Sequence, residues 1–182
     1  MKYISMLRGI NVGGRRIVRM DELKALYISI GMKNVSTYIQ SGNVLFESDS
    51  LKTEDLKSST ERSLEDKFGF RISVIIRTAD EMENIIVQCP FDNIDMKNDG
   101  SKIALIFLSS VSDQNILLEL KNYIKPGEKL IPGLREIYLS CPEGFGKTKL
   151  TNQLVEQRLN VAATSRNWRS VNKMNELLIN KF

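Results

Sequence analysis

The 182-residue sequence contains no histidine. This absence excludes imidazole as a general base or zinc ligand, so Ser-His-Asp and Cys-His catalysis are ruled out. Any chemistry must use carboxylates, lysines, hydroxyl groups, backbone amides or groups of a bound ligand. The sequence predicts no metal site and no cofactor.

Cysteine and long apolar runs are scarce as well. Cys89 and Cys141 lie far apart and form no CxxC pair, which predicts reduced thiols in the core rather than a disulfide. No apolar run approaches the roughly 20 residues that span a bilayer. The apolar stretch near the start is too short for a signal peptide. We therefore expect a cytoplasmic protein without a membrane partner.

Charge is unevenly distributed, although the formal net charge is only +4. Residues 1–19 hold five basic and no acidic residues, residues 146–182 carry a net charge of +5, and the middle carries −6. Basic end segments favour a polyanion or phosphate partner. A solvated basic surface without any ligand explains the same pattern equally well.

Hydrophobic periodicity predicts the order strand–helix–strand–strand–helix–strand twice along the chain. This order is the split βαβ, or ferredoxin-like, motif. We therefore predict an α+β protein with tandem ferredoxin-like βαββαβ units and antiparallel or mixed sheets. A polar stretch, residues 90–101, separates the halves. It predicts a first unit over residues 1–95 and a second over residues 96–182 with an added C-terminal helix.

Three details of the pattern can be checked directly. Residues 102–108 are almost fully apolar, which predicts a central strand covered on both faces. Residues 44–46 place apolar side chains on both faces of their strand, so the first sheet is also predicted to be covered. An RNA-recognition sheet needs an open face with paired aromatic residues. We therefore do not expect that mode of RNA binding.

The helices of the second half have predicted bounds and core faces. Residues 148–160 are predicted to form one helix. The inward face of the preceding helix is expected to hold Ile116, Leu117, Leu120, Tyr123 and Ile124. The closing helix is expected to bury Trp168, Val171, Met174 and Leu178.

The first candidate segment, residues 8–16, leaves a strand and precedes a helix. Backbone amides at such a position can bind an anion, and the candidates are Arg8, Asn11, Gly13 and Gly14. The spacing GxxxGG matches neither the dinucleotide fingerprint nor a P-loop. The alternative is a turn whose glycines need positive φ, with the arginines in water.

The second candidate segment is the predicted hairpin turn at residues 38–43. Its candidates are Gln40, Ser41 and Asn43, which offer hydrogen-bonding groups to a ligand. Glycine and asparagine also form turns without any functional role.

The third candidate segment, residues 142–149, resembles a Walker A loop. The required leading glycine would fall at Cys141, so the segment is not predicted to bind a nucleoside triphosphate in that mode. The start of a helix beside Lys147 and Lys149 is still a suitable phosphate site.

The fourth candidate segment, residues 164–169, joins the last strand to the last helix. Arg166 and Asn167 can face a ligand there, or Ser165 or Asn167 can simply cap the helix. Trp168 borders them and is a candidate ligand contact, although its place on an apolar helix face also predicts a core residue.

Taken together, four segments resemble one bacterial family, the domain of unknown function 1697. They are MLRGINVGGRR (6–16), TYIQSGNVLF (37–46), PEGFGKTKL (142–150) and AATSRNWRSVNKM (162–174). The resemblance covers nearly the whole chain and implies a two-part fold of ferredoxin-like units. It implies no established activity and transfers no catalytic residue. The chain has Thr148-Lys149 where the family often has Ser-Lys.

The resulting hypothesis is a protein that binds a phosphate-bearing small molecule or nucleic acid between its two halves. Arg8, Lys147, Lys149 and Arg166 would supply charge, and Asn11, Gln40 and Asn43 would supply hydrogen bonds. Two alternatives stay open. One is a histidine-independent enzyme acting on a nucleotide or phosphoester, and the other is a protein-interaction module.

Overall fold

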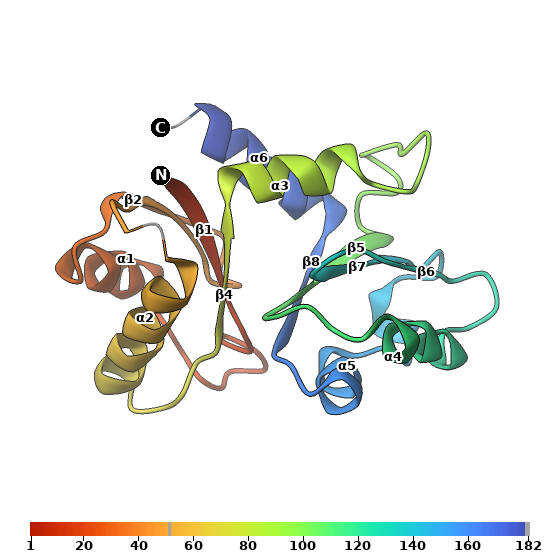
Figure 1. Ribbon diagram of the computed structural model, residues 1–182, viewed down its shortest axis with the longest axis horizontal. Coiled ribbons are helices and arrows are strands. Elements are labelled where there is room, and N and C mark those ends of the chain that lie inside the picture. Colours follow the sequence, from red (N-terminus) through yellow and green to blue (C-terminus); the bar gives the residue numbers. More distant parts are fainter. Residues whose placement is uncertain (51, 181–182) are drawn as a thin grey trace. The chain divides into compact units, whose positions relative to one another are not determined.

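The computed structural model describes residues 1–50 and 52–180 (Figure 1). The chain forms two compact units. The second is a single stretch, Ile86–Lys173. The first combines Met1–Ile85 with the chain from Met174 onward. The sequence places the boundary at residues 95 and 96, whereas the compact units divide within a helix at Ile85.

The first unit has the ferredoxin-like element order. Its elements are β1 (Lys2–Leu7), α1 (Met20–Ser29), β2 (Lys33–Tyr38), β3 (Asn43–Glu47), α2 (Thr53–Phe68) and β4 (Val74–Thr78), and α3 (Ala79–Val87) follows β4 directly. The strand order is β2-β3-β1-β4, and every neighbouring pair is antiparallel.

The second unit repeats this topology. Its elements are β5 (Ile103–Leu108), α4 (Gln114–Glu119), the 3₁₀ helix η1 (Leu120–Tyr123), β6 (Lys129–Pro132), β7 (Glu136–Ser140), the 3₁₀ helix η2 (Phe145–Lys147), α5 (Asn152–Leu159), β8 (Ala163–Asn167) and α6 (Trp168–Asn180). The strand order β6-β7-β5-β8 is equivalent to that of the first sheet. The predicted α+β class with two ferredoxin-like units is confirmed.

An aromatic cluster forms the centre of the first core. The Tyr3 and Phe46 rings stack at a centroid distance of 5.5 Å, and Tyr27 of α1 approaches Phe46 edge-on at 5.5 Å. The buried Tyr27 hydroxyl lies 2.6 Å from Ser5 Oγ, which satisfies both hydroxyl groups. α2 ends at Gly69, whose φ of 76° permits the left-handed helix end.

The central strands β3 and β5 are covered on both faces, as their apolar sequences predict. Val44, Leu45 and Phe46 are fully buried although they alternate between the two faces of β3. All six residues of β5 are buried, and β5 lies between β7 and β8. These two strands therefore present no open aromatic face of the kind that RNA-recognition sheets use.

Two predictions about helices in the second unit are wrong in part. The helix expected over residues 148–160 begins only at Asn152, because Thr151 caps it by accepting a hydrogen bond from the Leu154 N–H at 3.2 Å. Ile116, expected inside, is 37% exposed, whereas Leu117 and Leu120 are buried. The expected apolar face of α6 is confirmed, with Trp168, Val171, Met174 and Leu178 all buried.

Both cysteines are free thiols. Cys141 is buried as predicted, and Cys89 is half-buried. No helix of the described residues combines the length and apolar character needed to cross a membrane.

Candidate functional site

Two equivalent connections differ in length between the units, and each longer version contains a candidate motif. The β1–α1 connection is residues 8–19, whereas the equivalent β5–α4 connection is residues 109–113. Conversely, the β7–α5 connection is residues 141–151, against residues 48–52 between β3 and α2. Long connections in compact domains often carry function. Comparison of the repeats therefore directs attention to these two loops.

The first long loop contains a small hairpin, residues 11–16, which we call the basic finger. The Asn11 N–H donates to the Arg16 carbonyl at 3.1 Å, and the Arg15 N–H donates to the Val12 carbonyl at 3.0 Å. Gly13 and Gly14 at its tip have φ values of 57° and 72°. Positive φ at both central residues is the condition for a type I′ hairpin turn. The glycines thus form the expected turn.

Asn11 fixes the base of the finger. Its Nδ2 donates to the carbonyls of Val18 and Gln40, both at 2.9 Å, and its Oδ1 accepts from the Val18 N–H at 2.8 Å. The first and second candidate segments are therefore in direct contact. Both amide hydrogens of Asn11 are donated to backbone carbonyls, so its side chain stabilises the base of the finger. Its predicted contact with a ligand stays a prediction.

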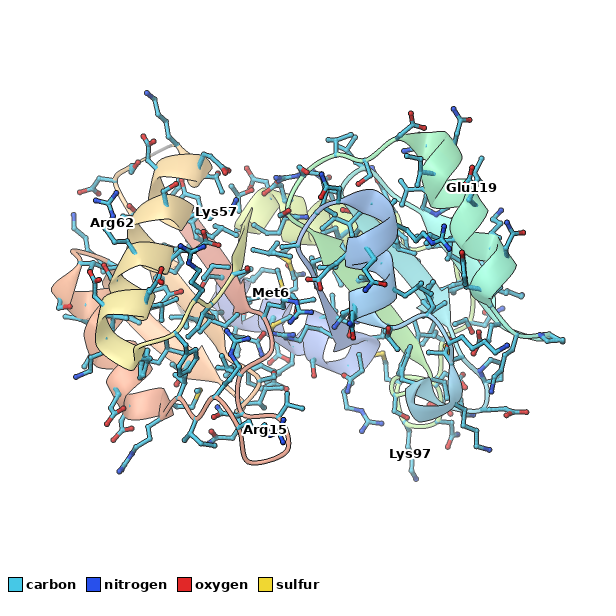
Figure 2. All side chains as sticks on the ribbon, turned by 90° about the horizontal axis from the view of Figure 1, so that it is seen from below. Met6, Arg15, Lys57, Arg62, Lys97 and Glu119 are labelled. Carbon is cyan, nitrogen blue, oxygen red and sulfur yellow. The ribbon has the colours of Figure 1, made fainter. Side chains whose placement is uncertain are left out.

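The two arginines of the finger have different environments. The Arg16 guanidinium lies 5.0 Å from the centroid of the Phe70 ring, and its Nη2 donates to the Arg71 carbonyl. Arg15 is exposed, and its side chain forms no hydrogen bond or ion pair with any described residue. Figure 2 shows Arg15 on the projecting hairpin. Sequence reasoning did not select Arg15, although its place beside a Gly-Gly turn indicates an outward side chain.

Two apolar side chains close to Arg15 in the sequence are also exposed to solvent. Val12, its partner across the hairpin, is 67% exposed, and Ile17 is 57% exposed. Arg19 is exposed too, but its guanidinium lies 3.4 Å from the Asp21 carboxylate. The finger thus presents one arginine without a carboxylate partner beside an exposed apolar residue.

The β2–β3 turn, residues 39–42, contacts the base of the finger through the Gln40 carbonyl. Asn43 is fully buried, and its Nδ2 donates to the Tyr38 carbonyl at 3.0 Å and to Ser41 Oγ at 3.1 Å. Gln40 is exposed, and within the described chain its side chain makes no hydrogen bond. Ile39 has a φ of 51°, a strained conformation for a β-branched residue.

Arg8 is half-buried at the end of β1, where its N–H donates to the Ser73 carbonyl at 2.9 Å. It lies at the same end of the first sheet as the finger and the β2–β3 turn. The structure therefore brings the seven candidates of the first unit together. They are Arg8, Asn11, Gly13, Gly14, Gln40, Ser41 and Asn43.

The second long loop holds the two candidate lysines. Lys147 is exposed, and its Nζ lies 3.7 Å from a carboxylate oxygen of Glu143. Lys149 is exposed and has no side-chain partner among the described residues. Because α5 begins only at Asn152, neither lysine lies within its first turn. Both lie instead in η2 and the extended segment after it.

A partly buried cluster holds this loop in place. The Thr148 hydroxyl donates to the Glu128 carboxylate at 3.0 Å, and its oxygen accepts from the Leu150 N–H at 3.2 Å. Burial raises the pKa of the nearby Cys141 thiol to about 12. Cys141 is therefore a protonated core residue at neutral pH and a poor nucleophile.

Arg166 is the most buried of the charged candidates. It is 7% exposed, and its Nη1 donates to Thr164 Oγ1 at 2.8 Å and to the Ser165 carbonyl at 2.9 Å. Burial lowers its pKa to about 10. Arg77 of β4 occupies the equivalent register position, because Arg77 pairs with Ile4 as Arg166 pairs with Leu105. Sequence reasoning missed Arg77, which alignment of the two repeats would have shown.

The other two candidates of the second unit have structural contacts. Asn167 Oδ1 accepts from the Ser170 N–H at 2.8 Å, so Asn167 caps the start of α6. Trp168 is buried, with its ring centroid 6.4 Å from that of Tyr138. Their contact with a ligand stays a prediction.

The family of the chain follows from its match to a family model. Residues 1–138 match the family described as protein of unknown function (DUF1697). The chain belongs to this family. The matched residues include the basic finger and the β2–β3 turn.

Other comparisons concern the fold. The conserved bacterial protein SP0830 from Streptococcus pneumoniae is similar in structure, with a TM-score of 0.77 and 24% sequence identity. The match covers 97% of this chain and 98% of that protein. At this identity the likeness shows the fold alone. A search among curated proteins finds no match.

Proposed function

We propose that the protein binds nucleic acid through the basic finger of its first unit. The observation that carries this proposal is a hydrogen-bonded hairpin that holds Arg15 in solvent without a competing carboxylate. A guanidinium fork matches the geometry of phosphate oxygens. The surrounding segment adds to the attraction, since residues 1–19 contain only basic charges.

The shape of the finger favours a polymer over a small molecule. Small-molecule sites are concave and enclose most of their ligand. The finger instead projects Arg15 and Val12 outward, and a two-stranded ribbon of this kind fits the major groove of a duplex. Val12 would contact sugar or base edges while Arg15 contacts a phosphate.

The anchoring of the finger supports this role as well. Asn11 ties its base by hydrogen bonds to Val18 and Gln40, and Arg16 packs on Phe70. A preformed hairpin loses little conformational entropy on binding. The exposed amide of Gln40 lies next to this base and is the proposed second hydrogen-bonding group.

Phosphate contacts carry no sequence information, so we expect modest sequence selectivity. Affinity should fall steeply with salt, with a slope of about −0.9 in log affinity against log salt for each phosphate contacted. Lys149, and Lys147 to a lesser extent because of Glu143, are proposed as further phosphate contacts in the second unit.

Binding of labelled single- and double-stranded oligonucleotides, followed by fluorescence anisotropy at several salt concentrations, tests the proposal. Arg15→Ala should weaken binding and reduce the salt slope by about one. Lys24→Ala is the matched control, because Lys24 is an exposed lysine on α1 of the same unit. If Arg15→Ala and Lys24→Ala have the same effect, the finger is not the binding element.

A further inference from the structure

The second unit contains a hollow of about 410 Å³ at one end of its sheet. Its floor includes Ile103 and Ser140, which are register partners on β5 and β7, and Lys129 of β6 pairs with the same Ser140. Phe91 and Pro142 contribute apolar walls. The volume lies within the range of ordinary small-molecule sites.

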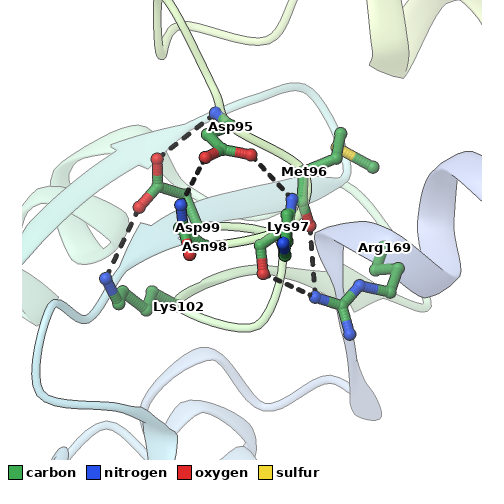
Figure 3. Close-up of polar contacts among 7 residues, drawn as sticks. All are labelled: Asp95, Met96, Lys97, Asn98, Asp99, Lys102 and Arg169. Carbon is green, nitrogen blue, oxygen red and sulfur yellow. Dashed lines mark hydrogen bonds and ion pairs between the residues drawn. The ribbon is translucent and has the colours of Figure 1, made fainter.

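One wall of the hollow is a tightly bonded loop, shown in Figure 3. Asp95 Oδ1 accepts from the Lys97 N–H at 2.9 Å, and the Asp99 N–H donates to the Asp95 carbonyl at 2.6 Å. Arg169 of α6 donates from Nη2 to the Lys97 carbonyl at 3.0 Å. These bonds fix the loop, so Asp99 and Lys102 line the hollow from a preformed wall.

The charges of the lining fall into two pairs. Asp99 and Lys102 neutralise each other, with Lys102 Nζ 3.5 Å from Asp99 Oδ1. Asp92 and Lys129 are exposed, and neither side chain forms a hydrogen bond or ion pair within the described ranges. The hollow therefore offers one available carboxylate, one available ammonium group and a half-buried aromatic side chain.

We propose that this hollow binds a mononucleotide whose base bears an amino group. The base stacks on Phe91, since base–aromatic stacking is favourable for every base. Lys129 binds the phosphate as a point charge. Asp92 accepts a hydrogen bond from the exocyclic amino group, as acidic side chains do from cytosine.

The net charge of the lining supports this ligand over simpler ones. The two carboxylates balance the two ammonium groups, so inorganic phosphate alone gains little from the site. A nucleoside without phosphate leaves Lys129 unused. Only a ligand with a flat ring, a hydrogen-bond donor and an anionic end uses Phe91, Asp92 and Lys129 together.

Isothermal titration with CMP, UMP, cytidine and inorganic phosphate tests this site. CMP should bind most tightly, because UMP presents a carbonyl oxygen to Asp92 where CMP presents an amino group. Phe91→Ala should weaken CMP binding roughly tenfold, and Asp92→Asn should reduce the preference for CMP over UMP. Lys129→Ala should bring the affinity for CMP down to that for cytidine.

Two controls separate this site from other effects. Lys121→Ala removes an exposed lysine of η1, outside the lining of the hollow, and should leave CMP binding unchanged. Arg15→Ala should also leave it unchanged, because this proposal does not rest on the finger. Equal binding of CMP, UMP and phosphate would overturn the proposal, as would wild-type affinity of the folded Phe91→Ala variant. Folding of each variant is checked by circular dichroism.

Discussion

Replacing Gly42 by alanine should lower the free energy of unfolding of the first unit by about 2–4 kcal/mol. Gly42 is buried in the β2–β3 turn at a φ of 74°, and an added Cβ would lie 2.5 Å from Ile10 Cδ1 and 3.0 Å from Leu7 Cβ. The positive φ costs an L-residue about 1–2 kcal/mol. Forcing a methyl group into a packed site costs about 1–3 kcal/mol, and the reduced entropy of the unfolded chain offsets about 0.4–1 kcal/mol.

Gly13→Ala is the matched control for this prediction. Gly13 has a φ of 57°, but an added Cβ there would meet no atom within 4 Å. It should therefore show only the conformational cost, about 1 kcal/mol. Unfolding by guanidinium is best followed by far-ultraviolet circular dichroism, because the single tryptophan, Trp168, lies in the second unit. Equal midpoints for the two variants, at unchanged m-values, would refute the argument from close approach.

Three further predictions concern the finger, the core thiol and the second loop. Asn11→Ala should destabilise the base of the finger by about 1–3 kcal/mol, seen as faster proteolysis or amide exchange within residues 11–18. The pKa of Cys141 rises from 9.0 to about 12 on folding, so its contribution to stability is complete below pH 9 and is lost as the pH rises toward 12. Cys141→Ala should accordingly reduce the alkaline loss of stability in unfolding measurements. Lys149→Ala should weaken oligonucleotide binding more than Lys147→Ala, because Glu143 already offsets the charge of Lys147; equal losses by anisotropy would contradict this order.

The fold was predictable where one pattern dominates locally. The apolar run of β5, the apolar face of α6 and the glycine after α2 each follow from neighbouring residues alone. The late start of α5 follows only in part, because the Thr151 cap is a local signal, whereas the bond that holds Thr148 in an extended segment comes from Glu128, twenty positions earlier in the chain. A bond of this sequence separation leaves no periodic signal.

The candidate site was predictable as a set of segments but not as a set of roles. Gly13 and Gly14 indicate a turn, yet the flanking strands are too short to show an alternating pattern. Local sequence could not show that Asn11 bonds to Val18 and Gln40 while Arg15 has no such bond. The fold decides which polar side chains form hydrogen bonds within the protein. It therefore also decides which ones can contact a ligand.

The division of α6 between the units has a consequence for synthesis on the ribosome. The second unit is continuous, Ile86–Lys173, whereas the first includes Met174 and Leu178, both buried. Domains generally fold as they emerge, with the N-terminal one first. Here the first unit is completed last, because Met174 and Leu178 are synthesised only after the whole of the second unit. The end of α6 therefore joins the first unit only after the second unit has been synthesised, whereas the aromatic core of the first unit contains no residue of α6.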